Sequence, residues 1–101
     1  MDYIESLRKA IRSLHGCDAD HMETVSVTER FKGKTVWEGD VEVFRLRGHP
    51  RASRCYAWVH TSGNKDEKQR YVAVLHLPPV NSAQTAVRAA IVDEFRSKEK
   101  K

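Results

Sequence analysis

Apolar residues recur at helical spacing at the start of the chain. One stripe is formed, at intervals of three or four residues, by Ile4, Leu7, Ile11 and Leu14. Asp2 is a suitable cap, and Glu5 follows three residues later as in a capping box. Gly16 is placed to end the helix. The segment "MDYIESLRKAIRSLHG" is therefore predicted to be an amphipathic helix.

Alternating patterns follow this helix. In "METVSVTERF" (residues 22–31), Val25 and Val27 share one parity, which predicts a half-buried strand. Lys32-Gly33 predicts a tight turn into a second strand, "KTVWEGDVEVFRLR" (residues 34–47).

The second strand changes parity along its length, because Val41 and Val43 share one face while Phe44 and Leu46 lie on the other. A β-bulge near Val43–Phe44, or one at Gly39, would reconcile the two halves. After such a bulge, Arg45 and Arg47 would face outward.

The remaining pattern predicts two more strands and a second helix. "GHP" (residues 48–50) is a turn in which the His49–Pro50 bond is a candidate for cis. "SRCYAWVH" and "RYVAVLHL" are strands, joined by the polar hairpin loop "TSGNKDEKQ". Asn81, with Gln84 three residues later, is the expected cap of a helix ending near Ser97. Its apolar face contains Ala83, Val87, Ala90, Ile91 and Phe95.

This order predicts an α+β fold, α-β-β-β-β-α, with an antiparallel sheet in a two-layer sandwich. Its 101 residues suit a single domain, expected over residues 1–97, with a basic flexible tail at 98–101. No stretch approaches the length of a membrane helix, and the acidic N-terminus does not resemble a signal peptide. Two cysteines are too few for a disulfide scaffold, so a cytoplasmic protein with reduced thiols is expected.

The third and fourth predicted strands are apolar on both faces. Cys55, Ala57 and Val59 share one face of the third strand, and its other face also carries aromatic residues. Two helices on one face of the sheet would leave the other face bare. Either the helices lie on opposite faces, or a partner covers the second face, and a homodimer through the sheet is the simplest partner.

Charge singles out one segment of the chain. The net charge is +4, but residues 43–64 contain no acidic residue. The candidate binding residues of this segment, with basic and aromatic side chains, are Arg45, Arg47, Arg51, Arg54, Tyr56, Trp58 and His60. An aromatic platform with basic flanks is typical of surfaces that stack bases and attract phosphates. The alternative is that Tyr56 and Trp58 belong to the core or to a dimer interface.

Other candidate chemistry is weaker, and no catalytic residue or cofactor is predicted. His15, Cys17 and His21 lie near two aspartates, but their spacing matches no recognised zinc pattern, so metal binding is left open.

Cys55 is on the opposite strand face from His60, so that pair cannot act together as nucleophile and base, and His76 could approach Cys55 only in a suitable register. The acids of the second strand are expected to form a solvated face or to pair with arginines of a neighbouring strand. They are Glu38, Asp40 and Glu42.

"TVWEGDVEVFRLRGHPRASRCYAW" and "AVLHLPPVNSAQTAVRAAI" together resemble a family of small uncharacterised bacterial proteins over residues 35–95. The resemblance implies a compact helix–four-strand–helix domain and no particular activity. The element order is also similar to a double-stranded-RNA-binding domain. That domain has three strands and a lysine-rich start to its second helix, whereas this helix begins "NSAQTAVRAA" with only Arg88.

The sequence favours a non-enzymatic protein-interaction module whose sheet face or basic block docks a partner. The alternative is binding of RNA or single-stranded nucleic acid through segment 43–64.

Overall fold

The computed structural model describes the backbone of residues 2–61 and 69–99. Its elements, in chain order, are α1 (Tyr3–His15), β1 (Asp18–Phe31), β2 (Lys34–Arg47), β3 (Arg54–Thr61), β4 (Gln69–Leu75) and α2 (Ala83–Glu99). The strands form one antiparallel sheet in the order β1-β2-β3-β4. The predicted α+β class, element order and antiparallel sheet are confirmed. Among the described residues, no helix combines the length and the apolar character needed to cross a membrane.

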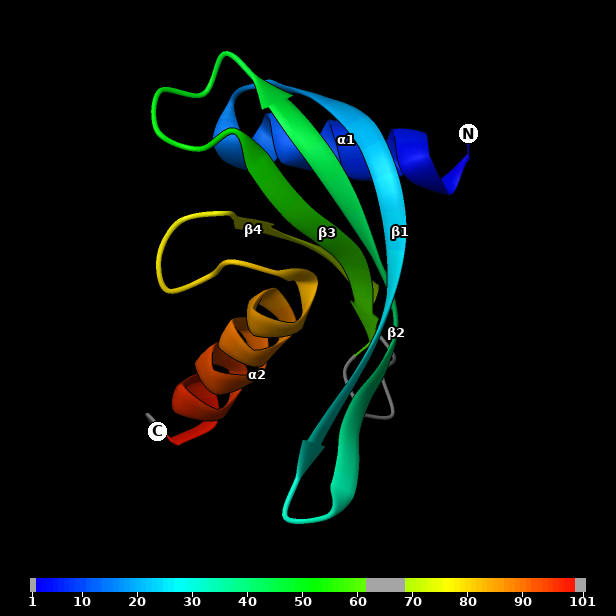
Figure 1. Cartoon of the computed structure of the whole chain (residues 1–101), viewed down its shortest axis with the longest axis vertical. Helices are drawn as coiled ribbons and strands as arrows, with labels where there is room; N and C mark the ends of the chain where they lie inside the picture. The colour runs from blue at the N-terminus through cyan, green and yellow to red at the C-terminus, as the bar shows by residue number, and fades with distance from the viewer. Residues whose placement is uncertain (1, 62–68, 100–101) are drawn as a thin grey trace.

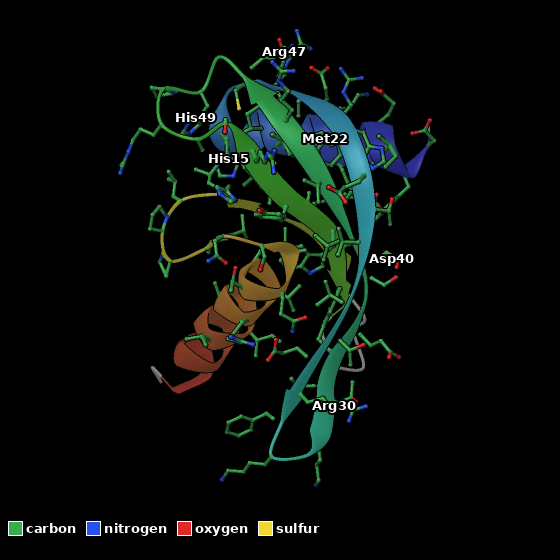
Figure 2. The ribbon with its side chains drawn as sticks, in the orientation of Figure 1. His15, Met22, Arg30, Asp40, Arg47 and His49 are labelled. Carbon is green, nitrogen blue, oxygen red and sulfur yellow. The ribbon has the colours of Figure 1, made fainter. Side chains whose placement is uncertain are left out.

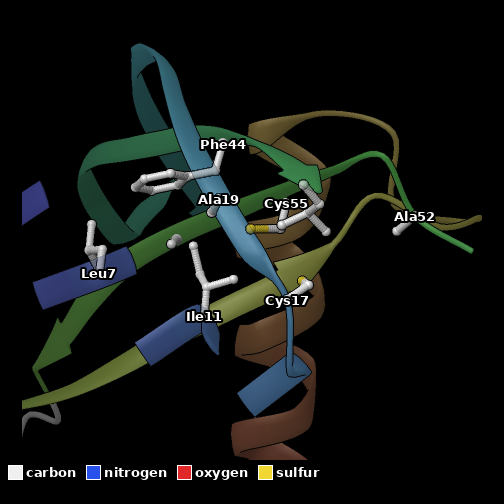
Figure 3. Close-up of a cluster of buried hydrophobic side chains, with 9 residues drawn as sticks. Leu7, Ile11, Cys17, Ala19, Phe44, Ala52 and Cys55 are labelled. Carbon is white, nitrogen blue, oxygen red and sulfur yellow. The ribbon is translucent and has the colours of Figure 1, made fainter. Parts of the chain in front are cut away.

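The two helices cover opposite faces of the sheet, so the molecule has three layers where the sequence predicted two (Figure 1). On one face, Leu7 and Ile11 of α1 pack against Phe44 and Cys55 (Figure 3). On the other face, Ala86 and Val87 of α2 belong to a second buried cluster. Both faces of the sheet are therefore covered in the described part of the chain, and the premise for dimerisation through a bare face is absent.

The third strand sits at the centre of this arrangement. Cys55 and Ala57 lie in the cluster under α1, while Tyr56 and Trp58 lie in the cluster under α2. Successive side chains of a strand point to opposite faces, so one apolar strand supplies both cores. The indole N–H of Trp58 is buried without a hydrogen-bond partner among the described residues.

The predicted bulge in the second strand is wrong in its position. β2 keeps its alternation through Val43 and Phe44, because Val43 packs under α2 and Phe44 packs under α1. The register shift lies in β1 instead, between His21 and Glu23. Met22 is the extra residue there, and it turns the odd-numbered side chains of β1 from the α1 face to the α2 face.

A second register shift falls between Glu29 and Arg30, where Val36 of β2 is the extra residue, so β2 does carry a bulge, but nearer the turn than either predicted position. Beyond it, the hairpin closes through Lys32 and Gly33, with φ of 54° and 78°. Two successive positive φ values are typical of the tight turn that matches strand twist, so the predicted turn is confirmed.

The first helix has the predicted ends. The Asp2 carboxylate accepts a hydrogen bond from the Glu5 N–H at 2.8 Å, and Gly16 ends the helix with φ of 67°. The strand after it starts four residues earlier than predicted, at Asp18 rather than Met22. Burial of Ala19 under α1 and the ion pair of Asp18 with Arg12 hold these strand-disfavouring residues in the sheet.

Three further local predictions differ from the structure. Ser82, rather than Asn81, caps α2, because its hydroxyl accepts from the Thr85 N–H at 3.2 Å. The helix runs to Glu99, beyond the predicted end at Ser97, and so includes part of the predicted tail.

The cis bond joins Pro78 to Pro79 and not His49 to Pro50. The predicted loop at 61–69 falls largely outside the described residues.

Candidate functional site

The predicted arginine block lies at the end of the sheet farthest from the β1–β2 turn. Arg45 of β2 and Arg54 of β3 are directly opposite each other in the register, and both are exposed. The Leu46 N–H donates to the Ser53 carbonyl at 2.8 Å, which makes the neighbouring Arg45–Arg54 position a closely spaced, non-hydrogen-bonded pair. Like charges in such a position repel. Neither arginine has a carboxylate within ion-pair distance among the described residues.

The other two arginines of the block differ in their surroundings. Arg47 binds the Asp20 carboxylate with two hydrogen bonds, of 2.7 and 3.1 Å. Arg51 is exposed in the loop between β2 and β3. The structure therefore places all four predicted arginines at the surface, but it leaves Arg45, Arg51 and Arg54 as the more available charges.

The aromatic residues of the predicted platform are not at the surface. Trp58 is 1% exposed and Tyr56 is 4% exposed, both beneath α2. The Tyr56 hydroxyl lies 2.6 Å from His76 Nδ1, and burial raises the pKa of Tyr56. The prediction of a base-stacking platform at Tyr56 and Trp58 is thus wrong, because the α2 helix packs on that face. The side chain of His60 lies outside the described residues.

An apolar groove, which the sequence analysis missed, lies at the opposite end of the molecule. It has a volume of about 610 Å³ and separates the β1–β2 hairpin from α2. Its walls, from the hairpin and the helix, are Glu29, Arg30, Phe31, Val36, Arg88, Ile91 and Val92. Phe31 is 63% exposed, and Val36 and Val92 are also exposed. We call this feature the hairpin groove.

A buried carboxylate, that of Glu29, lines the hairpin groove. Glu29 is 9% exposed and accepts hydrogen bonds from Gln84 and, at 3.3 Å, from Arg88. Gln84 also donates to the Thr28 carbonyl at 3.1 Å. A buried carboxylate needs such compensation, so these contacts tie α2 to β1 and fix the spacing of the groove walls.

The basic side chains around the hairpin groove give it a positive rim. Arg30 and Arg88 line the groove, Lys32 Nζ lies 5.5 Å from the centre of the Phe31 ring, and Lys34 is exposed next to the turn. Glu29 is already paired with Arg88, so its charge is compensated. Figure 2 shows Arg30 at this end and Arg47 at the other, so the hairpin groove and the arginine block are separate surfaces.

The cysteine–histidine hypothesis fails on geometry. Cys55 lies under α1, whereas His76 contacts Tyr56 on the α2 face. Burial raises the pKa of the Cys55 thiol to about 12, so the nucleophilic thiolate is scarce at neutral pH. Burial also raises the pKa of Cys17.

The candidate metal ligands do not converge. The rings of His15 and His49 are 6.4 Å apart, but His49 Nδ1 already accepts the Ala52 N–H at 2.9 Å and His15 Nε2 lies 3.0 Å from the Ala73 carbonyl (Figure 2). His21 contacts Glu42 at 2.8 Å on another element. Within residues 2–61 and 69–99, no group of three metal-ligating side chains is arranged to hold an ion.

In the part of the chain that the structure describes, the acids of β2 pair with hydroxyl groups rather than with arginines. Asp40 accepts from Ser26 at 3.1 Å and Glu38 accepts from Thr28 at 3.3 Å, both at exposed positions. Glu42 is buried and accepts from Thr24. The row is therefore a cross-strand ladder whose outer part is solvated, as one of the two alternatives predicted.

Comparisons of the chain with models of protein families, with curated proteins and with solved structures gave no match. The resemblance to a bacterial family over residues 35–95 stays a prediction. Functional inference therefore depends on the surfaces described above.

The buried thiol of Cys55 predicts a pH dependence of stability. Its pKa is about 12 in the folded chain against an ordinary 9.0, so the folded state disfavours the thiolate. Its contribution to the free energy of unfolding is complete below pH 9 and is lost as the pH rises towards 12. From pH 8 to pH 10, wild type should lose about 1 kcal/mol more than Cys55→Ala in urea unfolding. A stability difference between the two proteins that does not change with pH would contradict this burial.

Proposed function

We propose that this protein is a non-enzymatic interaction module whose hairpin groove docks a segment of another protein. The observation that supports this proposal is the volume of about 610 Å³ bounded by exposed apolar side chains of the hairpin and α2. Contiguous exposed apolar surface is costly in water and is typical of interaction sites. The two free, buried cysteines agree with a cytoplasmic location, which we propose with it.

The shape of the hairpin groove favours a polypeptide over a small ligand. Sites for small molecules bury most of the ligand surface. Here Phe31, Val36 and Val92 are each at least 40% exposed, so the walls are open rather than enclosing. A helix or extended segment can lay one apolar face along such walls while its other face stays in water.

Charge indicates which segment fits. Arg88 and Glu29 compensate each other, so the positive charge of the rim comes from Arg30, which lines the groove, and from Lys32, which lies over the Phe31 ring. Opposite charges across an interface increase association rates and exclude like-charged competitors. The proposed partner segment therefore has apolar residues on one face and acidic residues beside them.

A pair of synthetic amphipathic peptides tests this proposal. One carries leucines on one face and glutamates on the other, and its counterpart has lysines in place of the glutamates. The acidic peptide should bind and shift the amide NMR signals of Phe31, Val36 and Ile91. Phe31→Ala should weaken this binding by about tenfold, as for an apolar anchor of an interface.

The matched control is Tyr71→Ala. Tyr71 is another exposed aromatic residue, 47% exposed on β4 and outside the hairpin groove, so its removal should leave the peptide affinity unchanged. Equal binding of the two peptides, or equal losses in the two variants, would refute the proposed docking.

A second candidate function, binding of RNA or single-stranded nucleic acid, retains one observation in its favour. The facing arginines Arg45 and Arg54 repel each other, and neither has a described carboxylate within ion-pair distance, although Glu23 lines the same hollow as Arg54. Phosphates bound between them would relieve this repulsion. The burial of Tyr56 and Trp58 removes the stacking part of that hypothesis, so this function would depend on phosphate contacts alone.

Phosphate contacts make binding depend on salt. The affinity for a fluorescent single-stranded RNA should fall with salt, and each of Arg45→Ala and Arg54→Ala should reduce the slope of log K against log salt by about 0.7. Lys9→Ala, on the exposed side of α1, should leave the slope unchanged. Absence of RNA binding at low salt would exclude this second function.

A further inference from the structure

β1 is the first strand of the sheet, and within residues 2–61 and 69–99 no other strand covers its outer edge (Figure 1). In an antiparallel pair, alternate residues direct their backbone groups towards and away from the neighbouring strand. The Leu46 N–H donates to the carbonyl of Ser53, the residue before β3. The backbone N–H and C=O groups of even-numbered β2 residues therefore point towards β3. Thr24 and Ser26 are opposite Glu42 and Asp40, so their N–H and C=O groups point away from β2.

Helix side chains close this edge at both ends. Arg8 Nε of α1 donates to the Ala19 carbonyl at 2.8 Å. Gln84 Nε2 of α2 donates to the Thr28 carbonyl at 3.1 Å. The bulge at Met22 interrupts the strand next to the first of these contacts. What is left between them is an open edge, residues 23–27.

Between Glu23 and the contact of Gln84, the open edge has no charged residue or proline that would protect it against pairing. Natural edge strands are guarded by charged residues, prolines or short length. Here Glu23 is the one charged residue, and the rest of the open edge, "TVSV" (residues 24–27), is uncharged and rich in β-branched residues, which favour strands. The hydroxyls of Thr24 and Ser26 are already bound to Glu42 and Asp40, so these side chains stay on their own sheet.

A hollow beside the open edge gives room for the side chains of an added strand. It has a volume of about 290 Å³. Its lining, from β1, the neighbouring strands and the start of α2, is Glu23, Val25, Ser26, Val27, Val43, Arg54, Tyr56, Ser82, Ala83 and Gln84. Strand addition uses this combination, in which backbone groups give affinity and an adjacent pocket receives alternate side chains.

We propose that a second copy of this chain adds to the open edge, with the two β1 strands antiparallel about Val25. In this register Thr24 is opposite Ser26 of the partner subunit, and Ser26 is opposite the partner's Thr24. Each pair exchanges two N–H···O=C bonds, so all four outward-facing backbone groups of each copy are satisfied. The two sheets become one sheet of eight strands.

Other registers use the edge less well. A two-fold axis at Ser26 would need the Thr28 carbonyl, which Gln84 already occupies, and would bring Glu23 opposite the partner's Glu29. An axis at Thr24 would run the bulge at Met22 into the ladder. The register about Val25 avoids both problems. In this register the edge is complementary to a second copy of itself, so we take a second copy as the occupant, and such a two-fold contact forms a closed dimer.

Sedimentation at increasing concentration tests the proposal. Wild type should approach twice 11.6 kDa, whereas Ser26→Pro should stay a monomer. Proline removes an N–H that points away from the sheet, so the fold loses no backbone hydrogen bond. Tyr71→Pro makes the same change on the outer edge of β4, and it should dimerise as wild type does. A wild-type monomer at all concentrations overturns the proposal, as does loss of the dimer in Tyr71→Pro with its retention in Ser26→Pro.

Disulfide trapping gives a second readout that does not depend on the proline variant. Val25 would face the partner's Val25 across the two-fold axis in a closely spaced, non-hydrogen-bonded pair, where cysteines can be bridged. Val25→Cys should therefore form a covalent dimer under mild oxidation. Val36→Cys, at an exposed position in the hairpin groove, should not. Equal crosslinking of the two variants would also overturn the proposal.

Discussion

The rest of the structure depends on the burial of both faces of β3. Cys55 and Ala57 pack under α1, and Tyr56 and Trp58 pack under α2. A strand that is apolar on both sides must be covered on both sides, so the two helices cannot share one face. This constraint decides the layers of the molecule, the packing partner of each helix and the register of the neighbouring strands.

The neighbouring strands meet the constraint in different ways. β2 contributes Val43 to one core and Phe44 to the other by ordinary alternation along the strand, because the extra residue at this point belongs to β1. β1 contributes Ala19 to the α1 core and Val27 to the α2 core. These residues are eight positions apart, so in an uninterrupted strand their side chains would lie on the same face. An extra residue must therefore lie between them, and the bulge at Met22 supplies it. That bulge also limits the free edge of β1 to a short window.

Because the faces are filled, the available surfaces lie at the margins of the sheet. The arginine block is at one end, the hairpin groove is at the other, and the open edge of β1 lies between them (Figure 2). The surfaces differ in chemistry: paired positive charges, exposed apolar side chains with a basic rim, and unpaired backbone groups. The surfaces at which a partner can dock are therefore these margins and not an uncovered face.

The sequence predicted the local features that depend on nearby residues. The cap at Asp2, the end at Gly16 and the Lys32-Gly33 turn are confirmed, since each is decided within a few positions. Features decided by tertiary packing were predicted less well. The parity change in β2 was interpreted as a bulge, because periodicity alone does not distinguish a flipped strand from one buried on both faces.

The candidate site shows the same division. All four arginines of the segment are exposed, but Arg45 and Arg47 were expected to face outward only after a bulge that the structure does not have at either predicted position. For Tyr56 and Trp58 the sequence left two alternatives, an exposed stacking platform or core residues. Because α2 packs over them, they are core residues. The hairpin groove was missed because Phe31, Val36 and Val92 come from three elements. The available signal in the sequence was an aromatic residue, Phe31, directly before the predicted Lys32-Gly33 turn.

The most direct test of the doubly covered sheet is the accessibility of Trp58, measured in Trp37→Phe so that Trp58 is the one remaining tryptophan. With both faces filled, Trp58 is 1% exposed, so its emission should be blue-shifted and acrylamide should quench it weakly until the protein unfolds. Emission at the wavelength of free tryptophan, with strong quenching in the folded protein, would contradict the account.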